Sequence, residues 1–330
     1  MTQEQIAMSF SLSGSILSLG LIALAGYIAQ TSGLFGENGR KIMGDIMLKI
    51  TFPCLGFYSM VTKVDPQAFS QNMLAIGMGM LILIFGLIIG YIAVIPLKYS
   101  LKTRNTFVHL LSTCNYIFLP LPIVISLWPK QEGTMFLHTL GCGLVYWIVG
   151  IYPLTKGQPL STRIKNVFNR PMLSMILGLI VAFMGGGDYL KQIPDTNTLT
   201  FDNSLYVFIK SIMQSLDIMG SATIPLALIC VGATLASSTA KTNKKLLCYY
   251  SLMRLVVIPI LFVPFVKLSG MSLEASYIPL LISMMPASNV STVITHKFGG
   301  DEDLASAANL WSTPLALLTV PIIFPFLSSL

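Results

Sequence analysis

The stretch Leu111–Pro122 reads LSTCNYIFLPLP and interrupts an apolar run with two prolines and several small polar side chains. A second stretch, Ser283–Thr292, reads SMMPASNVST and repeats this arrangement in a later apolar run. Proline removes a backbone donor and clashes with the preceding helical turn. We therefore predict that Pro120 and Pro122 break one helix and that Pro286 breaks another.

The composition indicates which solvent surrounds these breaks. Of the 330 residues, 54% are hydrophobic and 10% are charged, and the mean hydropathy is +0.76. A soluble domain carries about 25% charged residues, so this chain has too few polar side chains to cover a globule in water. Lipid must surround most of it, which excludes soluble enzymes, nucleic-acid-binding proteins, disulfide scaffolds and disordered regulators. The five cysteines form no CxxC pair, and neither a metal site nor a cofactor is expected.

The apolar runs are long enough to cross a bilayer, which takes about 20 residues of helix. We expect an all-α polytopic membrane protein with ten transmembrane helices. The candidate spans are 11–30, 43–60, 72–97, 106–127, 133–154, 171–187, 206–236, 246–267, 275–296 and 304–328.

Basic residues alternate between the connections. The odd-numbered connections carry thirteen Lys and Arg residues, and the even-numbered ones carry four. Because cytoplasmic loops are enriched in Lys and Arg, the odd-numbered loops are expected in the cytoplasm. Both termini then lie outside, in a multi-pass protein of the plasma membrane.

Prolines recur along the chain at a nearly constant offset of 166 to 172 residues. The pairs are Pro53 and Pro225, Pro96 and Pro264, Pro120 and Pro286, and Pro153 and Pro321. This spacing predicts two five-helix repeats, residues 1–165 and 166–330. Since five is odd, the second repeat runs through the bilayer inverted, which is typical of transporters.

Small polar side chains gather beside the two predicted breaks. Broken helices place half-helix N-termini, which carry partial positive charge, inside the membrane. An Asn side chain there offers one acceptor and two donors without net charge, which suits a carboxylate. The alternative is that these side chains only join kinked helices to one another. The candidate substrate-binding residues are Asn115, Asn289, Ser288, Ser291, Thr113 and Tyr116.

Ionisable residues inside the spans are functional candidates by default. Asp45 and Asp217 each lie eight residues before one of the paired prolines, and Lys49 follows Asp45 at the i,i+4 spacing. They could relay a coupling proton or sodium ion, or they could form neutralised pairs near span ends. His296 is either a coupling or anion-contacting residue or an interfacial one. Arg254 is expected to extend towards the cytoplasm.

Several segments resemble the auxin efflux carrier family, which contains plant PIN-formed exporters and bacterial malate and malonate permeases. Asn115 with its two following prolines, and Asn169-Arg170-Pro171, resemble two further motifs of that family. The longer matching segments are GSATIPLAL (220–228), GATLA (232–236), PASN (286–289), FGGDEDLAS (298–306) and STPLALLTVP (312–321).

The resemblance implies two inverted five-helix repeats in which spans four and nine are broken and cross. It implies an elevator movement of spans three to five and eight to ten against a dimeric scaffold of spans one, two, six and seven. It also implies an organic anion as substrate, with Asn115 and Asn289 at its carboxylate. Two departures make auxin itself a poor first guess: bulky residues fill 116–119, and the connection 155–170 is short.

We therefore expect a secondary transporter for a mono- or dicarboxylate, which is not an enzyme and forms a homodimer in the lipid bilayer. The first alternative is a non-transporting receptor for an organic anion. The second is an intramembrane enzyme that uses Asp45 and Asp217. The sequence leaves open the substrate, the direction of transport, and coupling to protons, sodium or neither.

Overall fold

The computed structural model describes residues 3–36, 38–192, 204–237 and 242–329. Across those ranges every regular element is a helix, and an isolated bridge is the one β pairing. Six of these helices are long and apolar enough to cross a membrane, or seven if the bent pair α8 (Leu160–Val167) and α9 (Arg170–Phe183) is one span. The prediction of a helical multi-pass membrane protein is confirmed at this level.

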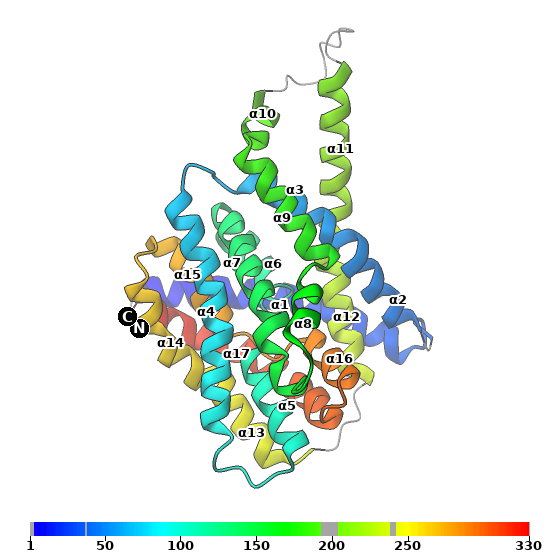
Figure 1. Ribbon diagram of the computed structural model, residues 1–330, viewed down its shortest axis with the longest axis vertical. Coiled ribbons are helices and arrows are strands. Elements are labelled where there is room, and N and C mark those ends of the chain that lie inside the picture. The colour runs from blue at the N-terminus through cyan, green and yellow to red at the C-terminus, as the bar shows by residue number, and fades with distance from the viewer. Residues whose placement is uncertain (1–2, 37, 193–203, 238–241, 330) are drawn as a thin grey trace.

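The helices of the first half are arranged as Figure 1 shows. They are α1 (Gln3–Thr31), α2 (Gly39–Ile46), α3 (Phe52–Lys63), α4 (Phe69–Ala93), α5 (Leu101–Ser112), α6 (Pro120–Leu127) and α7 (Glu132–Val145). A π-helical turn, Met47–Thr51, joins α2 to α3, and a second one, Tyr146–Gly150, extends α7. Short 3-10 turns occupy Pro129–Gln131 and Tyr152–Leu154.

The second half contains α8 and α9 and a further set of helices. They are α10 (Gly186–Gln192), α11 (Ser204–Ser221), α12 (Thr223–Ser237), α13 (Lys244–Leu252), α14 (Ile258–Leu268), α15 (Leu273–Ser283), α16 (Asn289–Lys297) and α17 (Glu302–Ser329). A π-helical turn, Met253–Val257, lies between α13 and α14.

Two of the predicted spans are each divided into short helices. Residues 106–127 fall on α5 and α6, which have 12 and 8 residues, and residues 275–296 fall on α15 and α16, which have 11 and 9. At 1.5 Å per residue, none of the four can cross about 30 Å of hydrocarbon alone. Length and composition therefore reveal fewer crossing helices than the ten spans expected.

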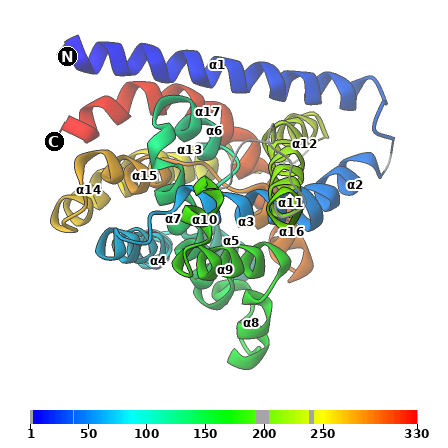
Figure 2. The ribbon, with the colours of Figure 1, turned by 90° about the horizontal axis from the view of Figure 1, so that it is seen from above.

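Helix α1 runs along one side of the molecule, beside α12 and α17 (Figure 2). Gly26 on α1 and Gly232 on α12 permit the closest approach: a Cβ at either position would collide with the carbonyl oxygen of Ile229 or Ala23 on the facing helix. Helices in membranes use small residues in this way to bring backbones together.

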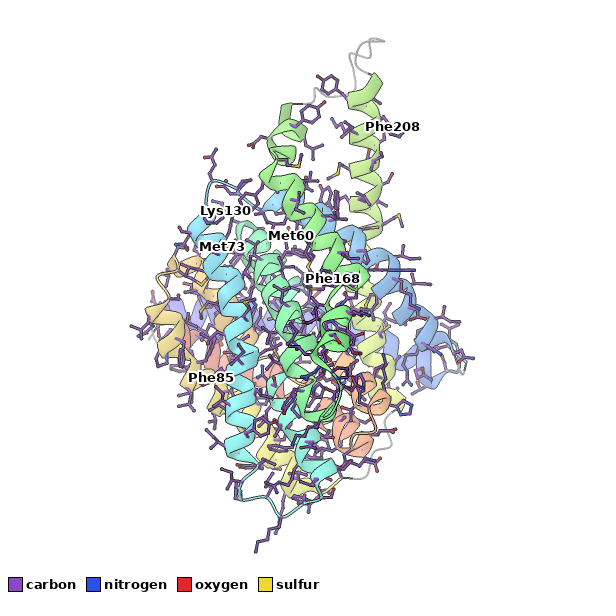
Figure 3. All side chains as sticks on the ribbon, viewed as in Figure 1. Met60, Met73, Phe85, Lys130, Phe168 and Phe208 are labelled. Atoms are coloured by element: carbon purple, nitrogen blue, oxygen red, sulfur yellow. The ribbon has the colours of Figure 1, made fainter. Side chains whose placement is uncertain are left out.

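Large apolar side chains cover much of the outer surface (Figure 3). Met73 on α4 and Phe208 on α11 are 40% and 64% exposed, whereas Met60 on α3 is fully buried. An apolar exterior of this kind fits a surrounding solvent of lipid chains.

Candidate functional site

The two divided spans meet backbone to backbone at their interruptions. We call residues 113–119, between α5 and α6, together with residues 284–288, between α15 and α16, the crossing. Cys114 and Ala287 form an antiparallel β-bridge there, and the Asn115 N–H donates to the Pro286 carbonyl at 2.9 Å. The Ala287 N–H donates to the Ser312 hydroxyl of α17 at 3.1 Å. The backbone groups that each interruption frees are thus bonded within the protein.

The prolines lie where the interruptions end. Pro120 and Pro122 occupy the first turn of α6, where a missing N–H leaves no hydrogen bond unmade. Pro286 lies in the extended link before α16. The three residues are therefore at helix starts or links, not at kinks inside continuous helices.

Asn115 is oriented by its own turn. Its side chain is 7% exposed, and its Oδ1 accepts the Phe118 N–H at 3.1 Å. In the described part of the chain, Nδ2 has no hydrogen-bond partner. The amide therefore presents two donors at the start of α6.

Asn289 is oriented by a chain of hydrogen bonds from α17. The Thr313 hydroxyl donates to Asn309 Oδ1 at 3.1 Å, and Asn309 Nδ2 donates to Asn289 Oδ1. Asn309 and Thr313 are 3% and 6% exposed. The oxygen of Asn289 is thus used, and its Nδ2 has no partner among the described residues. Sequence reasoning missed Asn309, although a polar residue in an apolar span is a signal that could have found it.

The candidate hydroxyl groups are bonded within the protein. Thr113 Oγ1 donates to the His109 carbonyl at 2.7 Å, so Ser291 Oγ donates to Thr113 Oγ1 at 2.8 Å. Ser288 Oγ accepts the Val290 N–H at 3.1 Å and caps α16. Of these contacts, the one between Ser291 and Thr113 joins the two divided spans.

Tyr116 is half-buried beside the same interruption. Its ring packs edge-on against Tyr146, with centroids 6.1 Å apart. It therefore forms part of the wall of the crossing.

Arg254 lies against the crossing, and the expectation that it extends towards the cytoplasm was wrong. Its side chain is fully buried, with Nε 2.8 Å from the Met285 carbonyl oxygen. Nη1 donates to Leu111 and Nη2 to Ile282, both at 3.3 Å. Helix C-termini leave carbonyls without partners, and two such ends hold this guanidinium inside the protein.

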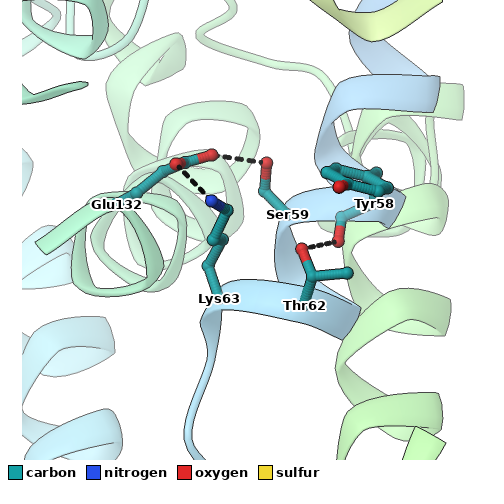
Figure 4. A network of polar contacts seen from close by, with 5 residues as sticks. All are labelled: Tyr58, Ser59, Thr62, Lys63 and Glu132. Carbon is teal, nitrogen blue, oxygen red and sulfur yellow. Dashed lines mark hydrogen bonds and ion pairs between the residues drawn. The ribbon is translucent and has the colours of Figure 1, made fainter. Parts of the chain in front are cut away.

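A second polar network joins α3 to α7 (Figure 4). The Glu132 side chain is 11% exposed. Its Oε1 accepts from the Ser59 hydroxyl at 2.9 Å, and Lys63 Nζ lies 3.5 Å from its Oε2. Thr62 donates to the Tyr58 carbonyl beside it at 2.8 Å. Sequence reasoning placed Glu132 in a connection and missed this network.

Comparison with known proteins agrees with the fold of a helical membrane protein. A family model described as "Membrane transport protein" matches residues 11–163 and 159–324. The chain belongs to this family. It is the auxin efflux carrier family that the sequence motifs resemble.

Two similar proteins match nearly the whole chain. An uncharacterized transporter of Methanocaldococcus jannaschii is 21% identical over 92% of this chain and 95% of its own length. An uncharacterized transporter of Methanothermobacter thermautotrophicus is 22% identical over 93% of this chain and 96% of its own length.

In this membrane transport protein, the candidate coupling residues have partners outside the crossing. Asp45 pairs with Lys49 at 2.9 Å, as the spacing predicts, and Asp217 is within hydrogen-bonding reach of Tyr58. His296, at the end of α16, pairs with Glu302 at 2.8 Å. No group of three or more His, Cys, Asp or Glu residues that could hold a metal ion occurs in the described ranges.

Proposed function

We propose that this protein is a secondary transporter that binds a small organic anion at the crossing and exposes it to each side of the membrane in turn. The observation that carries the proposal is that the side-chain amides of Asn115 and Asn289 are hydrogen-bonded in the same way. In both amides the oxygen accepts a bond from the protein, and the NH2 group has no partner within the described structure. Two NH2 groups with free donors favour a ligand group that only accepts hydrogen bonds, such as a carboxylate.

Helix ends at the crossing add to this preference. The N-termini of α6 and α16 carry partial positive charge. Neither helix has an acidic residue in its first turn to offset that charge. A carboxylate beside Asn115 and Asn289 would be stabilised by both ends, as anions are at helix N-termini generally.

The same proposal includes ten spans in two inverted repeats. The antiparallel bridge between Cys114 and Ala287 is the pairing expected when two equivalent links run in opposite directions. Irregularities in the helices also precede the paired Pro53 and Pro225, since a π-helical turn ends at Thr51 and α11 ends at Ser221.

In this scheme α4–α7 and α13–α17 move as one unit against α1–α3, α9, α11 and α12. A few polar contacts link the two units, and they are Gln5 to Ser329, Ser9 to the Pro321 carbonyl, Ser15 to Ser126, Ser328 to Met8, and Glu132 to Ser59 and Lys63. Few polar contacts have to be exchanged when one unit slides, which suits an elevator movement. We place the scaffold at a homodimer interface in the plasma membrane, with both termini outside.

Uptake of labelled carboxylates into proteoliposomes tests the site. Asn115→Ala and Asn289→Ala each remove donors to a charged ligand, so uptake should fall by about tenfold or more. Asn105→Ala is the matched control, because Asn105 contacts Lys156 at the far end of α5. Unchanged uptake in both folded variants would refute the site, and anion binding without uptake would favour a receptor.

A further inference from the structure

Arg254 is a charged residue whose side chain lies in the apolar interior of the protein. It lies in the π-helical turn Met253–Val257, between α13 and α14, and its side chain is fully buried. None of the ion pairs of the described residues includes it. A buried charge without a counter-charge is costly and is commonly functional in membranes.

The three carbonyl partners of Arg254 belong to two different helix ends. Leu111 lies in the last turn of α5, and Ile282 lies in the last turn of α15, with Met285 just beyond it. Arginine has five donors in a rigid planar fork, which lysine lacks. One guanidinium therefore holds the C-termini of both half-helices at fixed positions beside the crossing.

The charges at the crossing then add up to a positive value. Each helix C-terminus contributes about −0.5 and each N-terminus about +0.5 of an elementary charge. The Arg254 guanidinium offsets the C-termini of α5 and α15. The N-termini of α6 and α16 remain, and together they amount to about one positive charge.

We propose that Arg254 is a positioning residue for both breaks and the fixed cation that lets the crossing hold one negative charge, so that its substrate is a singly charged anion. The inference rests on the proposed function and adds to it the charge class of the substrate. A monocarboxylate matches the charge left at the two N-termini, whereas a second carboxylate would be buried without a counter-charge.

The test compares two probes, lactate and malate, which differ by one carboxylate group. Uptake is measured in proteoliposomes, with protein-free liposomes giving the passive background. Wild-type protein should take up lactate with a KM about tenfold or more below that for malate, the factor that corresponds to one charge left unpaired. Equal uptake of both probes, or preference for malate, would overturn the inference while leaving an anion transporter in place.

Variants separate the charge of Arg254 from its shape. Arg254→Gln should raise the KM for lactate by about tenfold or more, because the cation that offsets its charge is lost, and malate, with one more negative charge, should remain the poorer substrate. Arg254→Lys should keep the preference at a lower maximal rate, because charge remains and the fork does not. Arg104→Gln, on α5 away from the crossing, should leave both parameters unchanged.

The outcomes distinguish failure of the inference on Arg254 from failure of the proposed function. If Arg254→Gln keeps the wild-type KM for lactate, Arg254 does not supply the positive charge that holds the anion. If Arg254→Gln does not fold, the wild-type preference and the Arg254→Lys variant still decide the question. If wild-type protein takes up neither probe, the proposed function fails and this inference fails with it.

Discussion

A single amide group can select the sign of its ligand when its oxygen is already bonded. Asn115 uses Oδ1 to hold the Phe118 N–H, and Asn289 uses Oδ1 to hold Asn309. What remains on each side chain is an NH2 group with two donors. Metal cations such as Mg²⁺ and Ca²⁺ need oxygen ligands, so these two residues are suited to an anion and unsuited to a coupling cation of that kind.

Replacing Asn309 should therefore change the orientation of the Asn289 side-chain amide. In Asn309→Asp the side chain can no longer donate, so the Asn289 amide should turn and give its NH2 group to the new carboxylate. We expect the KM for anion uptake to rise by about tenfold or more, through the lost donors and the added negative charge. Asn105→Asp, near the other end of α5, is the control, and an unchanged KM in Asn309→Asp would contradict the oriented amide.

From the sequence, single residues could be chosen as candidates only where the local order of residues was informative. Asn115 and Asn289 were recognisable as site candidates because each lies within a few residues of a helix-breaking proline. The roles of Asn309 and Arg254 were not recognisable, because the amide that Asn309 orients lies 20 residues away along the chain and the carbonyls that Arg254 bonds lie 28 or more residues away. The direction that Arg254 points follows from two carbonyl clusters that exist only after α5 and α15 have come together.

Short helices inside a membrane depend on their ends. α6 and α16 have 8 and 9 residues, a length at which an isolated helix is marginal. Their N-termini are held by Asn115 and Ser288, and the preceding α5 and α15 end on Arg254. Prolines in the sequence indicated where these elements begin. No local pattern indicated that one arginine would bond the C-terminal carbonyls of both α5 and α15. No local pattern indicated that π-helical turns would precede α3 and α14.

The contact between α3 and α7 depends on one buried carboxylate. Glu132→Ala would leave the Ser59 hydroxyl and the Lys63 ammonium without their shared partner. We expect the free energy of unfolding in mixed micelles, followed by circular dichroism, to fall by about 1–3 kcal/mol. Glu274→Ala, which removes an exposed bond to Gln131, should change it by less than about 0.5 kcal/mol. Equal effects of the two changes would mean that the buried network stabilises the protein no more than an exposed hydrogen bond does.

At the scale of the whole molecule, two halves of one chain meet through their interruptions. The composition alone predicted a helical protein in lipid, and the structure and the family assignment confirm that class. The number of spans is harder to obtain, because a broken span divides its apolar residues between two helices that are each too short to be recognised. The inverted arrangement stays a proposal that rests on the paired prolines and the antiparallel bridge.

The meeting of the two breaks can be measured directly, because residue 114 is already a cysteine. Residues opposite each other in an antiparallel bridge have Cα atoms about 4.5–5.5 Å apart, within the range of about 4.4–6.8 Å that a disulfide spans. Ala287→Cys should therefore form a disulfide with Cys114 on mild oxidation in membranes, identified by mass spectrometry of the linked peptides. Ala308→Cys, an equally buried position on α17, should not. Failure of the Ala287→Cys thiol to pair with Cys114, under conditions that oxidise accessible thiols, would contradict the crossing on which the anion site depends.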